Sequence, residues 1–153
     1  MINKTSIKTK IGWVSVFEKK GKIFRIKFGK INKNSKSHTL KKFKKNLLKF
    51  YKGKISVIKA NAEVNGSKIQ IKVWNDLKRI KPGYTKTYGE IGKKFNISPR
   101  HVGKICGKNK LVLLIPCHRV IRSDKTLGGV SSVGGIGLKK KLLDFEKKFR
   151  NIN

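Results

Sequence analysis

Two helix starts on either side of a tight turn constrain the second half of this 153-residue chain more than any other feature. Thr87 is followed three residues later by Glu90, which is the pattern of a capping box at the start of a helix. Ser98 followed by Pro99 predicts a second start, because proline at the first helical position loses no hydrogen bond. Only a short turn, at residues 96–97, separates the two helices. We therefore predict a helix-turn-helix.

The second of these predicted helices, over residues 98–107, has two distinct faces. Its apolar face carries Val102, Ile105 and Cys106, and we interpret this cysteine as a packing residue. The opposite face is cationic and carries Arg100, His101, Lys104 and Lys108. A helix that enters a DNA groove has a basic face of this kind. An ordinary exposed helix in a lysine-rich chain would have one too, so the pattern alone does not decide between them.

Hydrophobic periodicity predicts the remaining elements. Apolar residues over 5–28, interrupted by a turn at 18–21, predict strands that form a β-hairpin, and helical spacing over 40–50 predicts an amphipathic helix that ends near Gly53. A short strand is expected at 55–58, and a helix capped by Ser67 over 67–80. The break at residues 65–67 predicts a small N-terminal α/β domain, 1–64, and a mainly helical domain, 65–153. The expected fold class is α/β (α+β).

The charge of the chain points to a polyanionic partner. Lys and Arg number 40 and Asp and Glu number 7, so 40 − 7 gives +33. A field of this size repels itself in the compact state unless a polyanion neutralises it, which makes nucleic acid the first partner to consider. Lys, Ile and Asn are all frequent, as an AT-rich coding sequence would make them, so charge alone does not establish binding. No apolar run approaches the ~18 residues of a membrane span, and we expect a soluble, intracellular (cytoplasmic) protein.

A cysteine follows an apolar run in the second half of the chain. Residues 111–115 are all apolar and predict a strand or extended segment, and the sequence Pro116-Cys117-His118-Arg119 comes next. A thiol is a good nucleophile only as the thiolate, which a nearby imidazole and positive charge favour. The two cysteines have no zinc-site spacing, and the glycine-rich stretch 128–137 lacks the Gly-Lys-Ser/Thr of a phosphate-binding loop. We therefore expect a nucleophilic cysteine, no metal and no cofactor.

The segment around this cysteine resembles one protein family. Ile115 to Val120 match the active-site hexad of the O6-alkylguanine-DNA alkyltransferases, or methylated-DNA–protein-cysteine methyltransferases. The order and spacing of other short segments are also similar to the family: 73–74, 82–83, 87–88, Arg100 with 102–103, Asn109, 134–135, 142–143 and Glu146. The resemblance covers roughly residues 67 to 147. It implies a ribonuclease-H-like N-terminal domain and a C-terminal winged helix-turn-helix domain.

The resemblance also implies an activity and a role for each matching residue. The activity is an irreversible, single-turnover transfer of an alkyl group from O6 of guanine in double-stranded DNA, and less so from O4 of thymine, to Cys117. His118 would act as a base through a water, Glu146 would orient it, and Asn109 would tie the recognition helix to the active-site segment. Tyr88 would contact the 3′ phosphate, Arg100 would fill the vacated space in the base stack and Ser131 would contact O6. The remaining predicted substrate or DNA contacts are Arg119, Lys104 and Lys139.

Two other functions compete with this one. The first is an alkyltransferase-like protein that binds damaged or ordinary DNA without transferring anything; such proteins lack the cysteine that is present here as Cys117. For the repair transferase we expect a monomer that can cluster on DNA. Val130 stands where the family has a tyrosine, which puts base selectivity in question. The second is a cysteine hydrolase, which would need an oxyanion hole that the sequence does not supply. The presence of Cys117, His118 and Glu146 favours the repair transferase.

Overall fold

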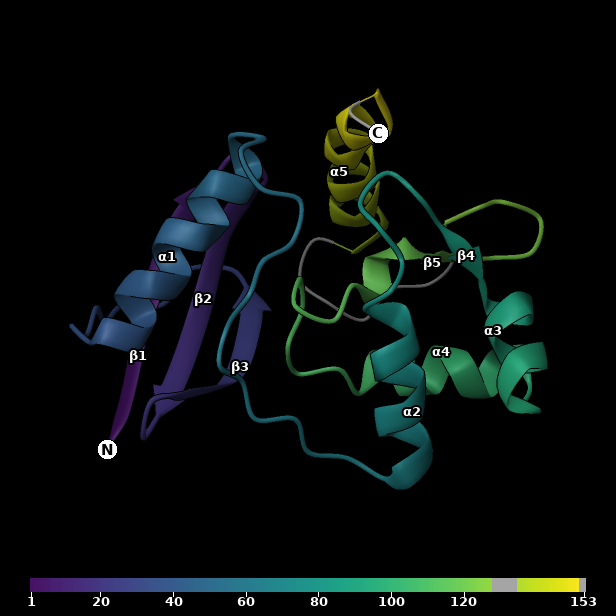
Figure 1. Ribbon diagram of the computed structural model, residues 1–153, viewed down its shortest axis with the longest axis horizontal. Coiled ribbons are helices and arrows are strands. Elements are labelled where there is room, and N and C mark those ends of the chain that lie inside the picture. Colours follow the sequence, from purple (N-terminus) through teal and green to yellow (C-terminus); the bar gives the residue numbers. More distant parts are fainter. Residues whose placement is uncertain (128–134, 152–153) are drawn as a thin grey trace. The chain divides into compact units, whose positions relative to one another are not determined.

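The computed structural model describes residues 1–127 and 135–151. The chain forms two compact units, one of residues 1–64 with 110–114 and one of residues 65–109 with 115–153. The first is built on strands and the second mainly on helices, so the fold is of the mixed α/β class (Figure 1). No helix among the described residues is long and apolar enough to cross a membrane.

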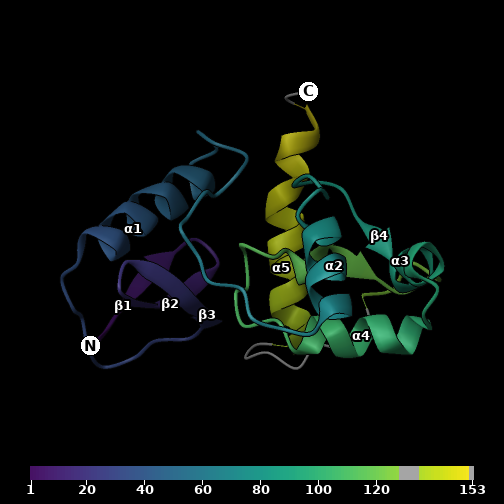
Figure 2. The same cartoon turned by 60° about the horizontal axis from the view of Figure 1, so that its bottom comes forward.

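The first unit is a three-stranded antiparallel sheet with one helix packed on it. Strands β1 (Ile2–Thr9), β2 (Gly12–Lys19) and β3 (Lys22–Phe28) lie in sequence order, and helix α1 (His38–Tyr51) lies along one face of this sheet (Figures 1 and 2). Ser37 caps α1 by accepting a hydrogen bond from the backbone N–H of Leu40. The alternation in β2 and β3 and the helical spacing of α1 direct their apolar side chains into one shared core.

Two segments in which the sequence predicted strands do not form regular strands. Residues 55–58 form no strand, and the chain reaches β3 only at Ala62, which makes an isolated bridge to Ile23. Residues 111–115 are likewise not a regular strand. Leu111 makes an isolated bridge to Ile26, and Leu113 has a φ of 75°, which breaks the extended conformation. The prediction of a strand at 55–58 was wrong, and residues 111–115, predicted as a strand or extended segment, meet β3 only at an isolated bridge.

The second unit contains the predicted helix-turn-helix. Helix α2 (Lys68–Leu77) precedes it, and α3 (Tyr88–Phe95) and α4 (Pro99–Gly107) form its two arms. Thr87 and Glu90 make the reciprocal hydrogen bonds of a capping box, and Asn96 ends α3 in the left-handed region with a φ of 56°. Both predicted helix starts are therefore confirmed. The indole N–H of buried Trp74 donates to the carbonyl of Ile105 over 3.1 Å and so fixes α4 against α2.

Two short strands and a final helix complete this unit. Strand β4 (Lys86–Thr87) pairs in parallel with β5 (Val120–Ile121). This pairing places the start of α3 beside η1 (Cys117–Arg119), the 3-10 turn directly before β5. Helix α5 (Gly135–Glu146) and the short turn η2 (Lys147–Asn151) follow. The elements that carry chemistry-bearing residues thus converge on η1.

The turn of the helix-turn-helix depends on a glycine. A Cβ atom on Gly92 would lie 2.5 Å from the carbonyl oxygen of Ile97, a backbone atom that cannot easily yield. We expect Gly92→Ala to lower the free energy of unfolding by about 1–3 kcal/mol through this overlap. Gly103→Ala is the matched control, because a Cβ there meets only Tyr88 at 3.9 Å, and alanine favours helix by up to about 1 kcal/mol. Chemical denaturation of both variants tests this; equal stability would contradict it.

Candidate active site

The predicted nucleophile begins a turn that the local sequence forces. Pro116 precedes it with φ −81° and ψ 65°, outside regular structure, and the backbone N–H of Cys117 donates to the carbonyl of Ile115 over 2.8 Å. The following residues return to extended structure at β5. The turn therefore presents the side chains of Cys117, His118 and Arg119 from three consecutive positions.

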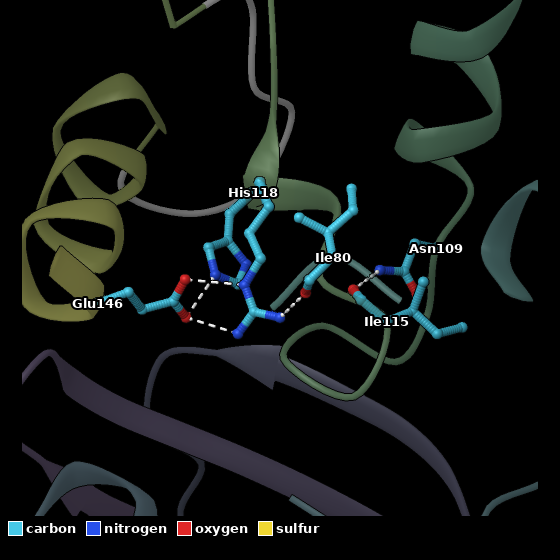
Figure 3. A network of polar contacts seen from close by, with 6 residues as sticks. Ile80, Asn109, Ile115, His118 and Glu146 are labelled. Atoms are coloured by element: carbon cyan, nitrogen blue, oxygen red, sulfur yellow. Dashed lines mark hydrogen bonds and ion pairs between the residues drawn. The ribbon is translucent and has the colours of Figure 1, made fainter. Parts of the chain in front are cut away.

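Glu146, at the last position of α5, accepts hydrogen bonds from two of these three side chains. Its Oε2 lies 2.9 Å from Nε2 of His118. The guanidinium of Arg119 binds the same carboxylate in a bidentate manner, with Nε 2.8 Å from Oε1 and Nη2 2.9 Å from Oε2. The third nitrogen that the guanidinium uses, Nη1, donates to the carbonyl of Ile80 over 2.6 Å. Figure 3 shows this network, with the Glu146 carboxylate directed at His118.

This ion-pair network is buried. Glu146 is only 2% exposed and Arg119 only 7%. Burial acts to raise the pKa of Glu146, but the charges and hydrogen bonds of His118 and Arg119 outweigh it and lower the pKa from 4.5 to about 2. Glu146 is therefore ionised at neutral pH. A carboxylate on Nε2 orients the imidazole and leaves Nδ1 as the nitrogen that can accept a proton.

Asn109 connects the end of the helix-turn-helix to the cysteine. Its side-chain N–H group donates to the carbonyl of Ile115 over 2.8 Å and to Sγ of Cys117 over 3.3 Å. The amide thus sets the position of the backbone directly before the thiol and of the sulfur atom itself. A donor aimed at sulfur stabilises a thiolate, and it acts to lower the pKa of Cys117.

The surroundings of Cys117 keep it as the neutral thiol. The neighbouring Cys106 and burial raise the pKa of Cys117 well above its ordinary value, although Asn109 and Lys139 oppose the rise. Cys106, which we interpreted as a packing residue, is partly buried, and Cys117 lowers its pKa. Cys117 therefore carries a proton at neutral pH.

Tyr88 and Lys139 form the side of the site next to the thiols. Burial, together with the two cysteines, raises the pKa of Tyr88 to about 12. The ammonium of Lys139 donates to the carbonyl of Val120 over 2.6 Å and to the Tyr88 hydroxyl over 3.4 Å. Burial lowers the pKa of Lys139, while the neighbouring cysteines act to raise it. A phenol that stays protonated and a buried cation thus stand beside the nucleophile.

The residues predicted from the sequence fall into three groups by position. The first surrounds η1 and contains Cys117, His118, Glu146, Asn109 and Tyr88. The second is exposed on α4 and contains Arg100 and Lys104. The third was predicted to contact DNA or substrate but is buried in the interior, and it contains Arg119 and Lys139.

The two buried cations need a different assignment from the one that the sequence suggested. The guanidinium of Arg119 is occupied by Glu146 and Ile80, and Lys139 is 4% exposed and donates to Val120. We therefore assign both to holding the site together. The sequence carries one signal for the pairing of Arg119 with Glu146, which is the rarity of carboxylates. Glu146 is one of four glutamates in a chain with 40 lysine and arginine residues.

Ser131, predicted to contact O6, and Val130 lie outside the described residues. Within 1–127 and 135–151, no three His, Cys, Asp or Glu side chains come together as metal ligands would. Chemically, the arrangement combines a thiol, an imidazole that a carboxylate orients, a neutral phenol and a buried ammonium, which suits attack by sulfur on an electrophilic carbon.

Comparison with known proteins identifies the family. The DNA-binding domain of 6-O-methylguanine DNA methyltransferase matches residues 68–148. A methylated-DNA–protein-cysteine methyltransferase of Methanocaldococcus vulcanius is 48% identical over 85 residues, which are 56% of this chain and 51% of the relative. The match to this curated relative thus spans about half of its length.

Two further similarities extend over nearly the whole chain. A probable methylated-DNA–protein-cysteine methyltransferase of Acanthamoeba polyphaga mimivirus is 34% identical over 151 residues, covering 93% of this chain and 95% of the relative. The crystal structure of Mycobacterium tuberculosis OGT in complex with DNA superposes with a TM-score of 0.81 at 26% identity, covering 95% of this chain and 92% of that one. The chain therefore belongs to the methylated-DNA–protein-cysteine methyltransferase family.

Proposed function

We propose that the protein repairs DNA by direct reversal, transferring a methyl or larger alkyl group from O6 of guanine to Cys117 in one irreversible turnover. The observation that carries this proposal is the position of Cys117, with Asn109 on its sulfur and the Glu146-bound His118 next in sequence, in the same unit as the helix-turn-helix. No cofactor is needed, because the alkyl group moves directly from oxygen to sulfur.

The transfer requires removal of one proton and delivery of another. Cys117 is protonated at rest, so a base must accept its proton, and Nδ1 of His118, acting through a water, is the base that we assign. The thiolate attacks the alkyl carbon, the S–C bond forms and the C–O6 bond breaks. The electron pair left on guanine takes up one proton, which balances the proton that the thiol gave to His118, and the Tyr88 hydroxyl beside Lys139 can donate a hydrogen bond to the leaving base. The product thioether is stable, and the thiol is not regenerated.

The substrate must leave the base stack before sulfur can reach it. A duplex hides O6 of guanine, and extruding a nucleotide costs a few kcal/mol. We assign Arg100, exposed near the start of α4, to the space that the nucleotide vacates, and Lys104 to a phosphate. The partner proposed here is therefore double-stranded DNA that contains O6-alkylguanine, bound by a monomer.

Mass spectrometry after incubation with duplex DNA containing O6-methylguanine tests the proposal. We expect one methyl group per molecule, located on the tryptic peptide 111–119 that contains Cys117, and none on a Cys117→Ala variant. Transfer is single-turnover, so excess DNA should not increase the gain. A folded protein that binds this DNA without gaining a methyl group would instead be an alkyltransferase-like binding protein.

Affinity for undamaged DNA is expected to depend steeply on salt. A contact surface dominated by phosphates releases counterions, so affinity should fall by about 10³-fold between ~50 and ~200 mM salt. Lys104→Gln should reduce the slope of log Kd against log salt by about one, as expected for the loss of one phosphate contact. Fluorescence anisotropy with a labelled duplex measures both. A response that is flat in salt would contradict binding through phosphates.

A further inference from the structure

More than half of the net charge lies on the unit that holds none of the residues assigned to alkyl transfer. The unit of residues 1–64 and 110–114 has 20 lysine and arginine residues and two glutamates, so 20 − 2 gives +18 of the total +33. Of these two glutamates, Glu18 is 3% exposed and accepts hydrogen bonds from the side chain of Asn3 and the backbone N–H of Gly21. The charged groups on the surface of this unit are therefore almost all cations.

Helix α1 gathers part of this charge on its solvent-facing surface. Its apolar residues Leu40, Phe43 and Leu47 are at most 2% exposed and pack against the sheet, on which α1 lies in Figure 2. The helix contains no Asp or Glu. The surface that α1 turns to solvent carries four exposed lysines, which we name the α1 lysine cluster: Lys41, Lys42, Lys44 and Lys45.

The α1 lysine cluster has no counter-charge. None of its ammonium groups forms an ion pair with a residue that the structure describes, whereas exposed lysines of the second unit do so, for example Lys94 with Asp76. Lys41 is three residues from Lys44 and four from Lys45, and like charges at these spacings destabilise a helix. An anionic partner that lies along α1 would remove this repulsion.

The shape of this surface favours a nucleic acid over a lipid membrane. A helix that binds a membrane surface inserts its apolar face among the lipids, and in α1 that face is buried against the sheet. From Lys41 to the half-buried Lys49, the lysines of α1 extend about 12 Å along the helix axis, at ~1.5 Å per residue. One strand of duplex DNA presents a phosphate about every 3.4 Å of its axis, so several phosphates lie within reach of these lysines.

We propose that the α1 lysine cluster is a second DNA-binding surface, which holds the phosphate backbone of double-stranded DNA in addition to the contacts of the helix-turn-helix. Lysine side chains that contact phosphates read no sequence, so this surface binds damaged and undamaged duplexes equally. It raises the affinity of the chain for any duplex and does not select the damaged base.

Lysine footprinting locates the surface directly. Acetic anhydride labels accessible amines of the full chain, and tandem mass spectrometry of chymotryptic peptides measures the label on each lysine. An undamaged duplex should lower labelling of the α1 lysine cluster several-fold more than labelling of Lys8 and Lys27. These two are exposed and follow buried Ile7 and Ile26, so they lie on the face of the sheet away from α1. Equal protection of both sets, protection of neither, or protection of the cluster by phosphatidylserine vesicles but not by the duplex would overturn the proposal.

Neutral variants measure the contribution to affinity. Glutamine at all four positions of the α1 lysine cluster removes four charges and keeps a similar helix propensity. In fluorescence anisotropy with an undamaged duplex, the slope of log Kd against log salt should fall by about 3–4, as expected for one phosphate contact from each lysine. The matched control removes four exposed lysines elsewhere in this unit and should leave the slope nearly unchanged: Lys8→Gln, Lys10→Gln, Lys27→Gln and Lys30→Gln. Equal changes in the two variants would indicate a general effect of net charge and would overturn the proposal.

Methyl transfer separates this surface from the proposed function. The glutamine variant should accept a methyl group from saturating O6-methylguanine duplex at the native single-turnover rate, because the four lysines lie outside the unit that contains Cys117. If the native chain transfers no methyl group but the duplex still protects the α1 lysine cluster, the proposed function fails and the α1 surface stands. If transfer occurs while the cluster remains fully labelled with duplex bound, the α1 surface fails and the proposed function stands.

Discussion

Replacing Glu146 by glutamine is expected to lower the free energy of unfolding by about 3–5 kcal/mol, because it removes the only carboxylate that the buried guanidinium of Arg119 contacts among the described residues. The amide that takes its place has no charge, so the cation stays buried and uncompensated. The imidazole of His118 also loses its charged acceptor at Nε2, and methyl transfer should slow together with stability.

Acid should weaken the native protein through the same carboxylate. Glu146 has its pKa lowered in the folded state from 4.5 to about 2. A lowered pKa means that its contribution is complete above pH 4.5 and is lost as the pH falls toward 2. Glu146→Gln cannot titrate, so the steep part of the stability curve between these pH values should become flatter.

A second carboxylate on α5 provides the matched control. Asp144 is half-exposed and pairs with the exposed ammonium groups of Lys140 and Lys147. Surface pairs of this kind contribute only ~0–1 kcal/mol, so Asp144→Asn should leave stability nearly unchanged. Urea denaturation at several pH values compares the two variants. Equal losses would mean that the buried network has no special energetic role.

Arg100→Ala is expected to slow methyl transfer from duplex DNA by about a hundredfold, because the variant cannot fill the space left by an extruded nucleotide whose unstacking costs a few kcal/mol. Transfer from a free O6-alkylguanine base should be unchanged, since no extrusion is required. The side chain is exposed near the start of α4, so its removal leaves the core intact.

The control for this variant lies one turn further along the same helix. Lys104→Ala also removes an exposed cation from α4, but its assigned partner is a phosphate, so it should weaken DNA binding without a selective loss of rate on bound duplex. Single-turnover rates at saturating DNA separate the two effects. An Arg100→Ala loss that is equal on duplex and free base would remove the role in extrusion.

The sequence predicted best those features that depend on neighbouring residues. Capping at Thr87 and Ser98 involves hydrogen bonds that span three residues, and both caps form as expected. The strand predicted at 55–58 is absent, and residues 111–115, predicted as a strand or extended segment, are not a regular strand, for the opposite reason. A strand exists only with a partner, and the apolar character of five residues does not say which edge of a sheet, if any, they will meet.

The candidate site divides in the same way. The chemical types at the site, and the family to which they belong, could be inferred from consecutive residues around Cys117. The pairing of Arg119 with Glu146 and the burial of Lys139 could not, because each depends on groups that lie on different elements. The helix caps at Thr87 and Ser98 and the motif around Cys117 were thus determined by the sequence itself. Which cations face inward was decided only when the packing of η1 against α2 and α5 set the direction of each side chain.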